Sequence, residues 1–153
     1  MGLQVLVMID PVKAGICADS RTVLVLDDIM LNQDGSFRSF EPNYMHGRFG
    51  NVLLVNGKQF PEITMQGSTH RFHIINTANA RSFSLNFAQE QITIIGEDVG
   101  YVKPYNVSRL LIHPGERYEV LVQIDEAITL THETRSGQSP LALLRPSEAS
   151  FSR

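Results

Sequence analysis

The chain is a succession of short apolar runs separated by turn signals, and this pattern constrains its fold more than any other feature. Residues 22–26 (TVLVL), 52–55 (VLLV) and 91–95 (QITII) are rich in β-branched residues and too short for typical helices. Segments with helical periodicity are scarce. The best of them, residues 79–89, is short and contains strand-forming residues. The pattern therefore predicts an all-β fold.

Residues 117–124 show the clearest alternation. One face of this segment carries Tyr118, Val120, Val122 and Ile124, and the opposite face is mostly polar. Alternation with this period predicts a strand that is buried on one side only. Partly alternating residues at 71–75 and a short run at 128–131 add further strands.

Turn residues separate these runs. Asn56-Gly57 directly follows an apolar run, Asn32-Gln33-Asp34-Gly35 is a turn signal, and Pro114-Gly115 separates two strand candidates. Short spacing of this kind predicts about seven to nine strands in two stacked antiparallel sheets, as a Greek-key β-sandwich or barrel with little helix.

Composition narrows the possible partners. The chain has 153 residues, 42% of them hydrophobic and 19% charged, which is typical of a globular domain. Its net charge is −3, so we expect no nucleic-acid partner. No apolar run approaches the roughly 20 residues of a membrane helix, so we expect no membrane partner. The start lacks a secretory leader, and the single cysteine, Cys17, leaves the compartment unknown.

Five histidines are the first place to look for metal chemistry. His70 and His73 have a spacing that chelates on a helix, but side chains alternate along a strand, so these imidazoles should point to opposite faces. We interpret this stretch as an ordinary strand with two partly exposed imidazoles. His46 precedes a glycine loop, His113 stands at the Pro-Gly turn and His132 ends a short strand. No sequence feature gathers them at one point.

Other catalytic chemistry has little support. Cys17 has no histidine after it until His46, whereas a blue-copper loop supplies both ligands within a few residues. The sequence contains neither a Gly-x-Ser-x-Gly elbow nor a glycine-rich phosphate loop. Asp27 and Asp28 are adjacent, so on a strand they face opposite ways, and we expect a solvated strand end. We therefore expect no catalytic, cofactor-binding or metal-binding residue in this chain.

The remaining conspicuous residue types are expected to have structural roles. Three glycines should supply positive φ at bends: Gly47, Gly50 and Gly57. Two asparagines should bind local backbone after a strand: Asn76 and Asn79. Arg81 should anchor that same turn. Arg71 and Arg117 are interpreted, like it, as cations that bind loop carbonyls and carboxylates.

Four stretches, in this order, resemble the second (middle) cupredoxin domain of three-domain, laccase-like multicopper oxidases. They are TVLVLDD at 22–28, GRFGNVLLVNG at 47–57, RFHIINTANAR at 71–81 and PGERYEVLV at 114–122. Pro61 follows the second stretch at the spacing of the family. The resemblance covers residues 22–124 and implies a cupredoxin-like Greek-key sandwich.

The same resemblance implies domain boundaries. Residues 1–11, which contain GLQVLVMIDP, are similar to the end of a preceding cupredoxin domain. Residues 12–146 would form the cupredoxin-like domain, and residues 147–153 a polar tail or linker.

The copper-ligand motifs of the family are absent from this sequence: His-x-His pairs, His-x-x-His-x-His and His-Cys-His. His73 stands where the family often has arginine, so no ligand carries over. The resemblance implies a non-catalytic spacer whose partners are the neighbouring copper-bearing domains of a parent enzyme. That parent would hold copper, oxidise phenols, amines or a metal ion by single electrons, and reduce dioxygen to water. The family is usually periplasmic or secreted.

Two alternatives remain open. In the first, the chain is a small copper enzyme that assembles His46, His70, His113 and His132 from neighbouring subunits at an interface. In the second, it is a binding module that adds a partner strand to an exposed sheet edge and oligomerises with itself.

Overall fold

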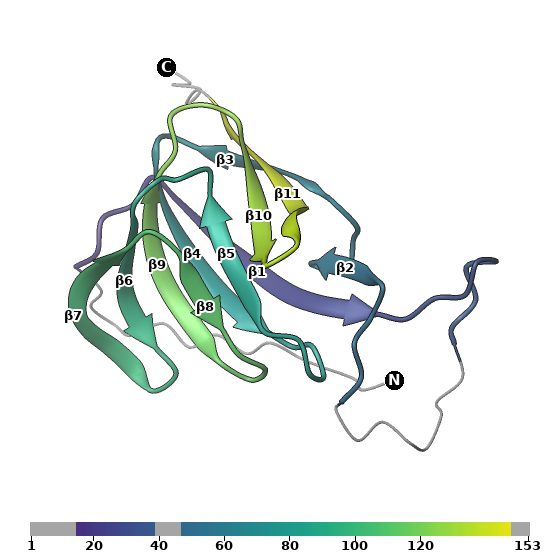
Figure 1. Cartoon of the computed structure of the whole chain (residues 1–153). Coiled ribbons are helices and arrows are strands. Elements are labelled where there is room, and N and C mark those ends of the chain that lie inside the picture. Colours follow the sequence, from purple (N-terminus) through teal and green to yellow (C-terminus); the bar gives the residue numbers. More distant parts are fainter. Residues whose placement is uncertain (1–14, 39–46, 148–153) are drawn as a thin grey trace.

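The computed structural model describes residues 15–38 and 47–147, and in this part the chain folds into two facing sheets without any helix (Figure 1). Consequently, no helix of the described residues is long and apolar enough to cross a membrane. The described strands are β1 (Ser20–Ile29), β2 (Val52–Val55), β3 (Glu62–Gln66), β4 (Thr69–Asn76), β5 (Phe83–Phe87), β6 (Ile92–Glu97), β7 (Gly100–Val107), β8 (Leu110–Ile112), β9 (Arg117–Gln123), β10 (Ile128–Thr134) and β11 (Gly137–Ser147).

The predicted all-β sandwich is confirmed, and its strand pairing is mixed. One sheet has the order β2-β1-β4-β9-β6-β7 and the other the order β3-β11-β10-β5-β8. Two strand pairs are parallel, β1 with β4 and β11 with β3. The expectation of purely antiparallel sheets is therefore wrong. A parallel pair needs a crossover instead of a tight hairpin, and local turn signals cannot reveal it.

The core lies between the two sheets and is aromatic at its centre. Phe72 of β4 and Phe87 of β5 belong to different sheets, are fully buried, and have ring centroids 5.2 Å apart. Truncating either ring to alanine would cost about 3–5 kcal/mol by the usual cost of such cavities. Other fully buried large side chains are Leu24, Leu26, Ile74, Phe83, Leu85, Ile92, Ile112 and Leu130.

The predicted runs match observed strands, except that Gln91 and Ile124 lie just outside β6 and β9, and several strands were not predicted. β3, β5 and β7 lack a clear apolar run in the sequence, and the apolar run at 141–144, which lies in β11, was not predicted to be a strand. Residues 79–89, the best candidate for helical periodicity, contain β5 instead. β11 continues through Ser147, whose hydroxyl donates to the carbonyl of Met65 in β3. The first residue of the proposed tail 147–153, Ser147, is thus part of β11, and residues 1–11 and 148–153 lie outside the described residues.

The predicted turns are confirmed. Asn56 and Gly57 both have positive φ (52° and 75°) and follow β2. Gly35 has a φ of 81°, and its amide donates to the Asn32 carbonyl. Gly115 has a φ of 86° in the turn that joins β8 to β9. These positions need the left-handed conformation that glycine and asparagine adopt most readily.

Candidate functional site

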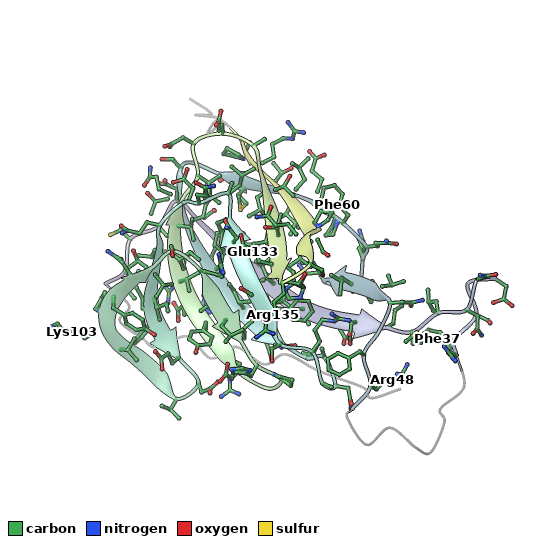
Figure 2. The ribbon with its side chains drawn as sticks, in the orientation of Figure 1. Phe37, Arg48, Phe60, Lys103, Glu133 and Arg135 are labelled. Carbon is green, nitrogen blue, oxygen red and sulfur yellow. The ribbon has the colours of Figure 1, made fainter. Side chains whose placement is uncertain are left out.

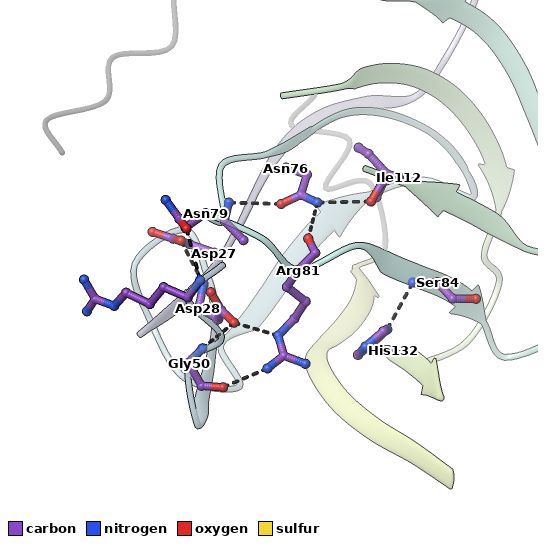
Figure 3. Close-up of polar contacts among 11 residues, drawn as sticks. Asp27, Asp28, Gly50, Asn76, Asn79, Arg81, Ser84, Ile112 and His132 are labelled. Atoms are coloured by element: carbon purple, nitrogen blue, oxygen red, sulfur yellow. Dashed lines mark hydrogen bonds and ion pairs between the residues drawn. The ribbon is translucent and has the colours of Figure 1, made fainter. Parts of the chain in front are cut away.

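A buried ion pair stands near the end of β1, where the sequence predicts a solvated strand end (Figure 3). Asp28 Oδ2 accepts from Arg81 Nε at 2.7 Å and from the Gly50 amide at 2.7 Å, and the Asp28 side chain is only 2% exposed. Arg81 Nη2 donates to the Gly50 carbonyl at 2.7 Å. The Arg81 side chain thus anchors loop 47–51, while the Arg81 carbonyl accepts from Asn76 Nδ2 at 2.7 Å within the predicted turn. Asp27 is half-buried, and burial raises the pKa of its carboxyl.

A glycine is required at position 50 because loop 47–51 lies very close to the backbone of Ile29, and not because of a positive φ. A Cβ at this position would lie 2.4–2.6 Å from the backbone N, O and C of Ile29, inside any van der Waals contact. Gly47 and Gly57 have φ values of +82° and +75°, as predicted. The glycine of the ion-pair cluster therefore allows loop 47–51 to lie against β1, where Asp28 binds it.

Asn76 fixes the chain just after β4. It is fully buried, its Oδ1 accepts from the Ala78 amide at 3.0 Å, and its Nδ2 donates to the Ile112 carbonyl at 3.0 Å. The local role predicted for Asn76 is therefore confirmed. The prediction for Asn79 is wrong, because its Oδ1 accepts from the amide of Arg48, 31 residues away. Both asparagines lie in the polar cluster shown in Figure 3.

The Asp28–Arg81 pair is the functional candidate that the sequence analysis missed. The parallel register of β1 and β4 aligns Leu26 with Asn76, which brings the chain after each strand to the same end of the sheet. Both residues stand in the stretches that resemble the family, and the acidic end of the first could have suggested a basic partner. The pairing itself depends on the parallel alignment of β1 and β4.

His70 is a structural core residue. It is fully buried on the inward face of β4, which corrects the expectation of a partly exposed imidazole. Its Nε2 lies 3.3 Å from the Ile124 carbonyl and must donate to it, so Nδ1 accepts from the Ser20 hydroxyl at 2.6 Å. Burial lowers the pKa of His70, partly opposed by the bond to Ile124. Both ring nitrogens are therefore used within the fold.

His132 is also built into the core, although the sequence predicts that it ends a short strand. It lies within β10, is 5% exposed, and its ring meets Phe83 edge-on with centroids 5.2 Å apart. Its Nδ1 accepts from the Ser84 amide at 3.0 Å, the contact drawn in Figure 3. Burial lowers the pKa of His132, and the nearby Arg81 guanidinium acts in the same direction.

His73 points to the outer face of β4, opposite to His70, as the alternation predicts. Its Nε2 accepts from Arg21 Nε at 2.7 Å, and its Nδ1 lies 3.8 Å from Glu119 Oε2. Arg71 forms an ion pair with the same Glu119 and donates to the Tyr101 hydroxyl at 2.8 Å. This row of charges ties β1, β4, β9 and β7 together on the outside of the six-stranded sheet.

The remaining predicted residues are dispersed. His113 is exposed, and its Nδ1 lies 2.8 Å from the Ser82 hydroxyl. Cys17 has an exposed thiol, and His46 lies outside the described residues. Arg117 binds the carbonyls of Gly115 and Asp98, as predicted for a turn-binding cation. Within residues 15–38 and 47–147, no group of three or more His, Cys, Asp or Glu side chains could hold a metal ion.

Comparison with known proteins agrees with this architecture. The sequence model of the multicopper oxidase family matches residues 14–138. The chain belongs to the multicopper oxidase family. Its fold is that of the laccase-like multi-copper oxidase CueO from the lignin-degrading bacterium Ochrobactrum sp., with a TM-score of 0.77 and 34% identity over 89% of this chain and 32% of that one. These comparisons confirm the resemblance to laccase-like multicopper oxidases and the cupredoxin-like fold.

The curated relatives of this multicopper oxidase domain have more than one assigned role. "Multicopper oxidase LPR1 homolog 5" of Oryza sativa subsp. japonica is 35% identical over 112 residues, which are 69% of this chain and 17% of the relative. "Cell division protein FtsP" of Actinobacillus succinogenes is 36% identical over 107 residues, or 67% of this chain and 22% of the relative. The chain thus spans about a fifth of the length of these curated relatives.

Proposed function

We propose that this chain is the middle cupredoxin domain of a three-domain protein and acts as a non-catalytic spacer between two copper-bearing domains. The observation that carries the proposal is the use of its histidines. His70 and His132 lie in different sheets, and each is buried and hydrogen-bonded within the core. Their imidazoles serve the sandwich and are not available to a metal ion without breaking it.

Copper in the parent protein would therefore be held by the neighbouring domains. Bound copper supplies one-electron chemistry and dioxygen reduction in this family. The donors of the described residues do not fit it, because no three of their His, Cys, Asp or Glu side chains gather at one point and because His73 and His113 each have a protein partner. The contribution of this chain is positional. A rigid sandwich keeps the copper-bearing domains at a fixed separation and orientation.

The activity of the parent has two candidates. By family, it would couple the one-electron oxidation of a phenol, an amine or a metal ion to the reduction of dioxygen to water. The similarity to FtsP, whose name assigns it to cell division, supports a second role in which the same domains serve that process. Identities of 35% and 36% do not favour either relative. Oxidase assays of the parent separate the two roles.

The alternative of a strand-adding module has less support from the sheet edges. β7, at one edge of the six-stranded sheet, carries Lys103 and Pro104, which disfavour pairing with another strand. β8, at one edge of the other sheet, has only three residues. A periplasmic or secreted location and the absence of nucleic-acid and membrane partners remain proposals of the same kind.

Copper titration tests the spacer proposal. Calorimetry and EPR spectroscopy with Cu²⁺ should detect no stoichiometric tight binding, and no intense visible charge-transfer band should develop. The variant His46→Gln serves as a control, since His46 was a candidate of the copper-enzyme alternative. One tightly bound copper per chain, lost in that variant, would overturn the proposal. The flanking coding sequence gives an independent check, with His-x-His motifs expected upstream and a His-Cys-His cluster downstream.

A further inference from the structure

Residues 31–38, which we call the arm, form a short hairpin that projects from the sandwich beyond the end of β1 (Figure 1). An antiparallel bridge between Leu31 and Phe37 closes the hairpin. The Asn32 amide donates to the Ser36 carbonyl at 2.9 Å, and the two side chains bond at 3.0 Å. The arm therefore has a defined conformation although it lies outside the core.

The base of the arm is fixed to the body by the buried cluster. The side chain of Asn51 accepts from the Leu31 amide at 2.9 Å and donates to the Leu31 carbonyl at 3.0 Å. Next to Asn51, both backbone polar groups of Gly50 bind the Asp28–Arg81 pair. A surface that is ordered before binding loses little conformational entropy when it binds. The arm would therefore lose little conformational entropy if another surface bound to it.

Two phenylalanines are exposed at this end of the molecule. Phe37 on the arm is 56% exposed, and Phe49 on the adjoining loop is 44% exposed and lies 5.6 Å from the Arg81 guanidinium. Figure 2 shows Phe37 on the arm and Arg48, the neighbour of Phe49, at the same end. Single exposed apolar side chains are ordinary. One on the projecting arm and one on the loop that holds its base give this end of the molecule an apolar contact surface.

We infer that the arm docks on a flanking cupredoxin domain of the same polypeptide. This inference rests on the proposed spacer function. Since Phe37 and Phe49 are each about half exposed, burying them completely would remove roughly 150–250 Å² from water, well below the roughly 800 Å² per partner of a stable interface between free proteins. A covalently tethered domain has an effective concentration in the millimolar range, so a small surface suffices. The size of the surface thus favours a tethered domain over a second copy.

The position of the arm gives this contact a mechanical role. Near the start of β1, Asp19 binds the amides of Ser68 and Thr69, and the Gly67 amide donates to the Ser147 carbonyl. The described chain therefore enters and leaves at this end. The arm lies at the other end of β1, about 33 Å away for a strand of ten residues. A second contact at this distance from the two ends of the described chain would resist rocking of the flanking domain and fix its orientation.

Hydroxyl-radical footprinting tests the inference by comparing the full-length polypeptide with this 153-residue chain. Phe37 should be oxidised several-fold more slowly in the full-length protein. The substitution Phe37→Ser should leave the denaturation midpoint of the 153-residue chain unchanged, because the side chain is exposed. In the full-length protein it should speed proteolysis between the domains by about tenfold or more, the effect of losing one buried aromatic side chain.

Phe60→Ser is the matched control, since Phe60 is 45% exposed on the connection between β2 and β3, away from the arm (Figure 2). It should leave interdomain proteolysis unchanged. Equal oxidation of Phe37 in both proteins would overturn the inference. So would protection of Phe37 in the 153-residue chain that grows with concentration, because the occupant would then be a second copy. Neither result depends on copper titration, so failure of the docking inference and failure of the spacer proposal are distinguishable.

Discussion

Arg81 and Asp28 are 53 residues apart in sequence, and the Arg81 Nε atom donates to Asp28 Oδ2 at 2.7 Å. The carboxylate is almost fully buried, whereas the guanidinium side chain keeps 21% of its surface exposed. The pair joins the end of β1 to the connection that follows β4, and it holds loop 47–51 through Gly50. A buried charge must keep its partner, since an unpaired carboxylate in the interior is strongly unfavourable.

We expect Arg81→Met to lower the free energy of unfolding by about 3–5 kcal/mol, because Asp28 is left buried without its countercharge. Urea denaturation measures the loss. Arg145→Met is the matched control, since Arg145 binds Glu62 at the same 2.7 Å with both side chains about half exposed. The control should lose less than about 1 kcal/mol. Equal losses in the two variants would contradict a buried Asp28.

The free energy of unfolding should decrease as the pH is lowered, because of His70 and His132. Burial lowers the pKa of both imidazoles in the folded state, whereas in the unfolded chain they titrate near their ordinary value of about 6.5. Below that pH the unfolded chain binds protons that the folded chain does not. The stabilising contribution of the neutral imidazoles is therefore fully present above about pH 6.5 and is lost as the pH falls toward their lowered pKa values. Each histidine reduces the free energy of unfolding by at most about 1.4 kcal/mol for each pH unit.

The measurement is the free energy of unfolding between pH 5 and 7.5 for the wild type and for His70→Asn and His132→Asn. Each substitution should flatten the acid slope. Phe83→Leu, a neighbour that packs on His132, should lower stability equally at every pH and leave the slope unchanged. A slope that both histidine variants retain would show that other groups cause it.

Gly50→Ala should destabilise the fold by about 1–3 kcal/mol, since the new methyl group would collide with the Ile29 backbone. Backbone atoms cannot rotate aside as a flexible side chain can. Gly15→Ala is the control, because a Cβ there meets nothing within 4 Å. Thermal or urea denaturation compares the two. If Gly50→Ala is as stable as the control, loop 47–51 does not lie against β1 as described.

Glu97→Gln should lower the pKa of Tyr105 from about 12 toward the ordinary value of 10, because the Tyr105 hydroxyl donates to this carboxylate at 2.7 Å and its charge opposes ionisation. Ultraviolet absorbance titration measures tyrosine ionisation, and Tyr105→Phe identifies which of the four tyrosines is responsible for the highest transition. A pKa that stays near 12 in Glu97→Gln would exclude Glu97 as the main cause.

The local features of the fold were predictable because they depend on neighbouring residues. The Asn56-Gly57 and Pro114-Gly115 turns were predictable because asparagine and glycine readily adopt the positive φ found at Asn56, Gly57 and Gly115. The two faces of β9 follow from the strict alternation of its residues. Alternation also placed His70 and His73 on opposite faces. It could not say that His70 would be fully buried, because burial depends on which face the second sheet covers.

The all-β class, the turns and the multicopper oxidase family could all be inferred from the order of the amino acids, since these depend on the period of apolar residues, on backbone preference and on ordered motifs. The tertiary structure alone decided the parallel pairing of β1 with β4, the ion pair between Asp28 and Arg81, and the close approach that requires Gly50. Each of these contacts joins residues that lie between about twenty and about fifty positions apart in the chain. Their partners are therefore chosen by the packing of whole sheets and not by any local pattern.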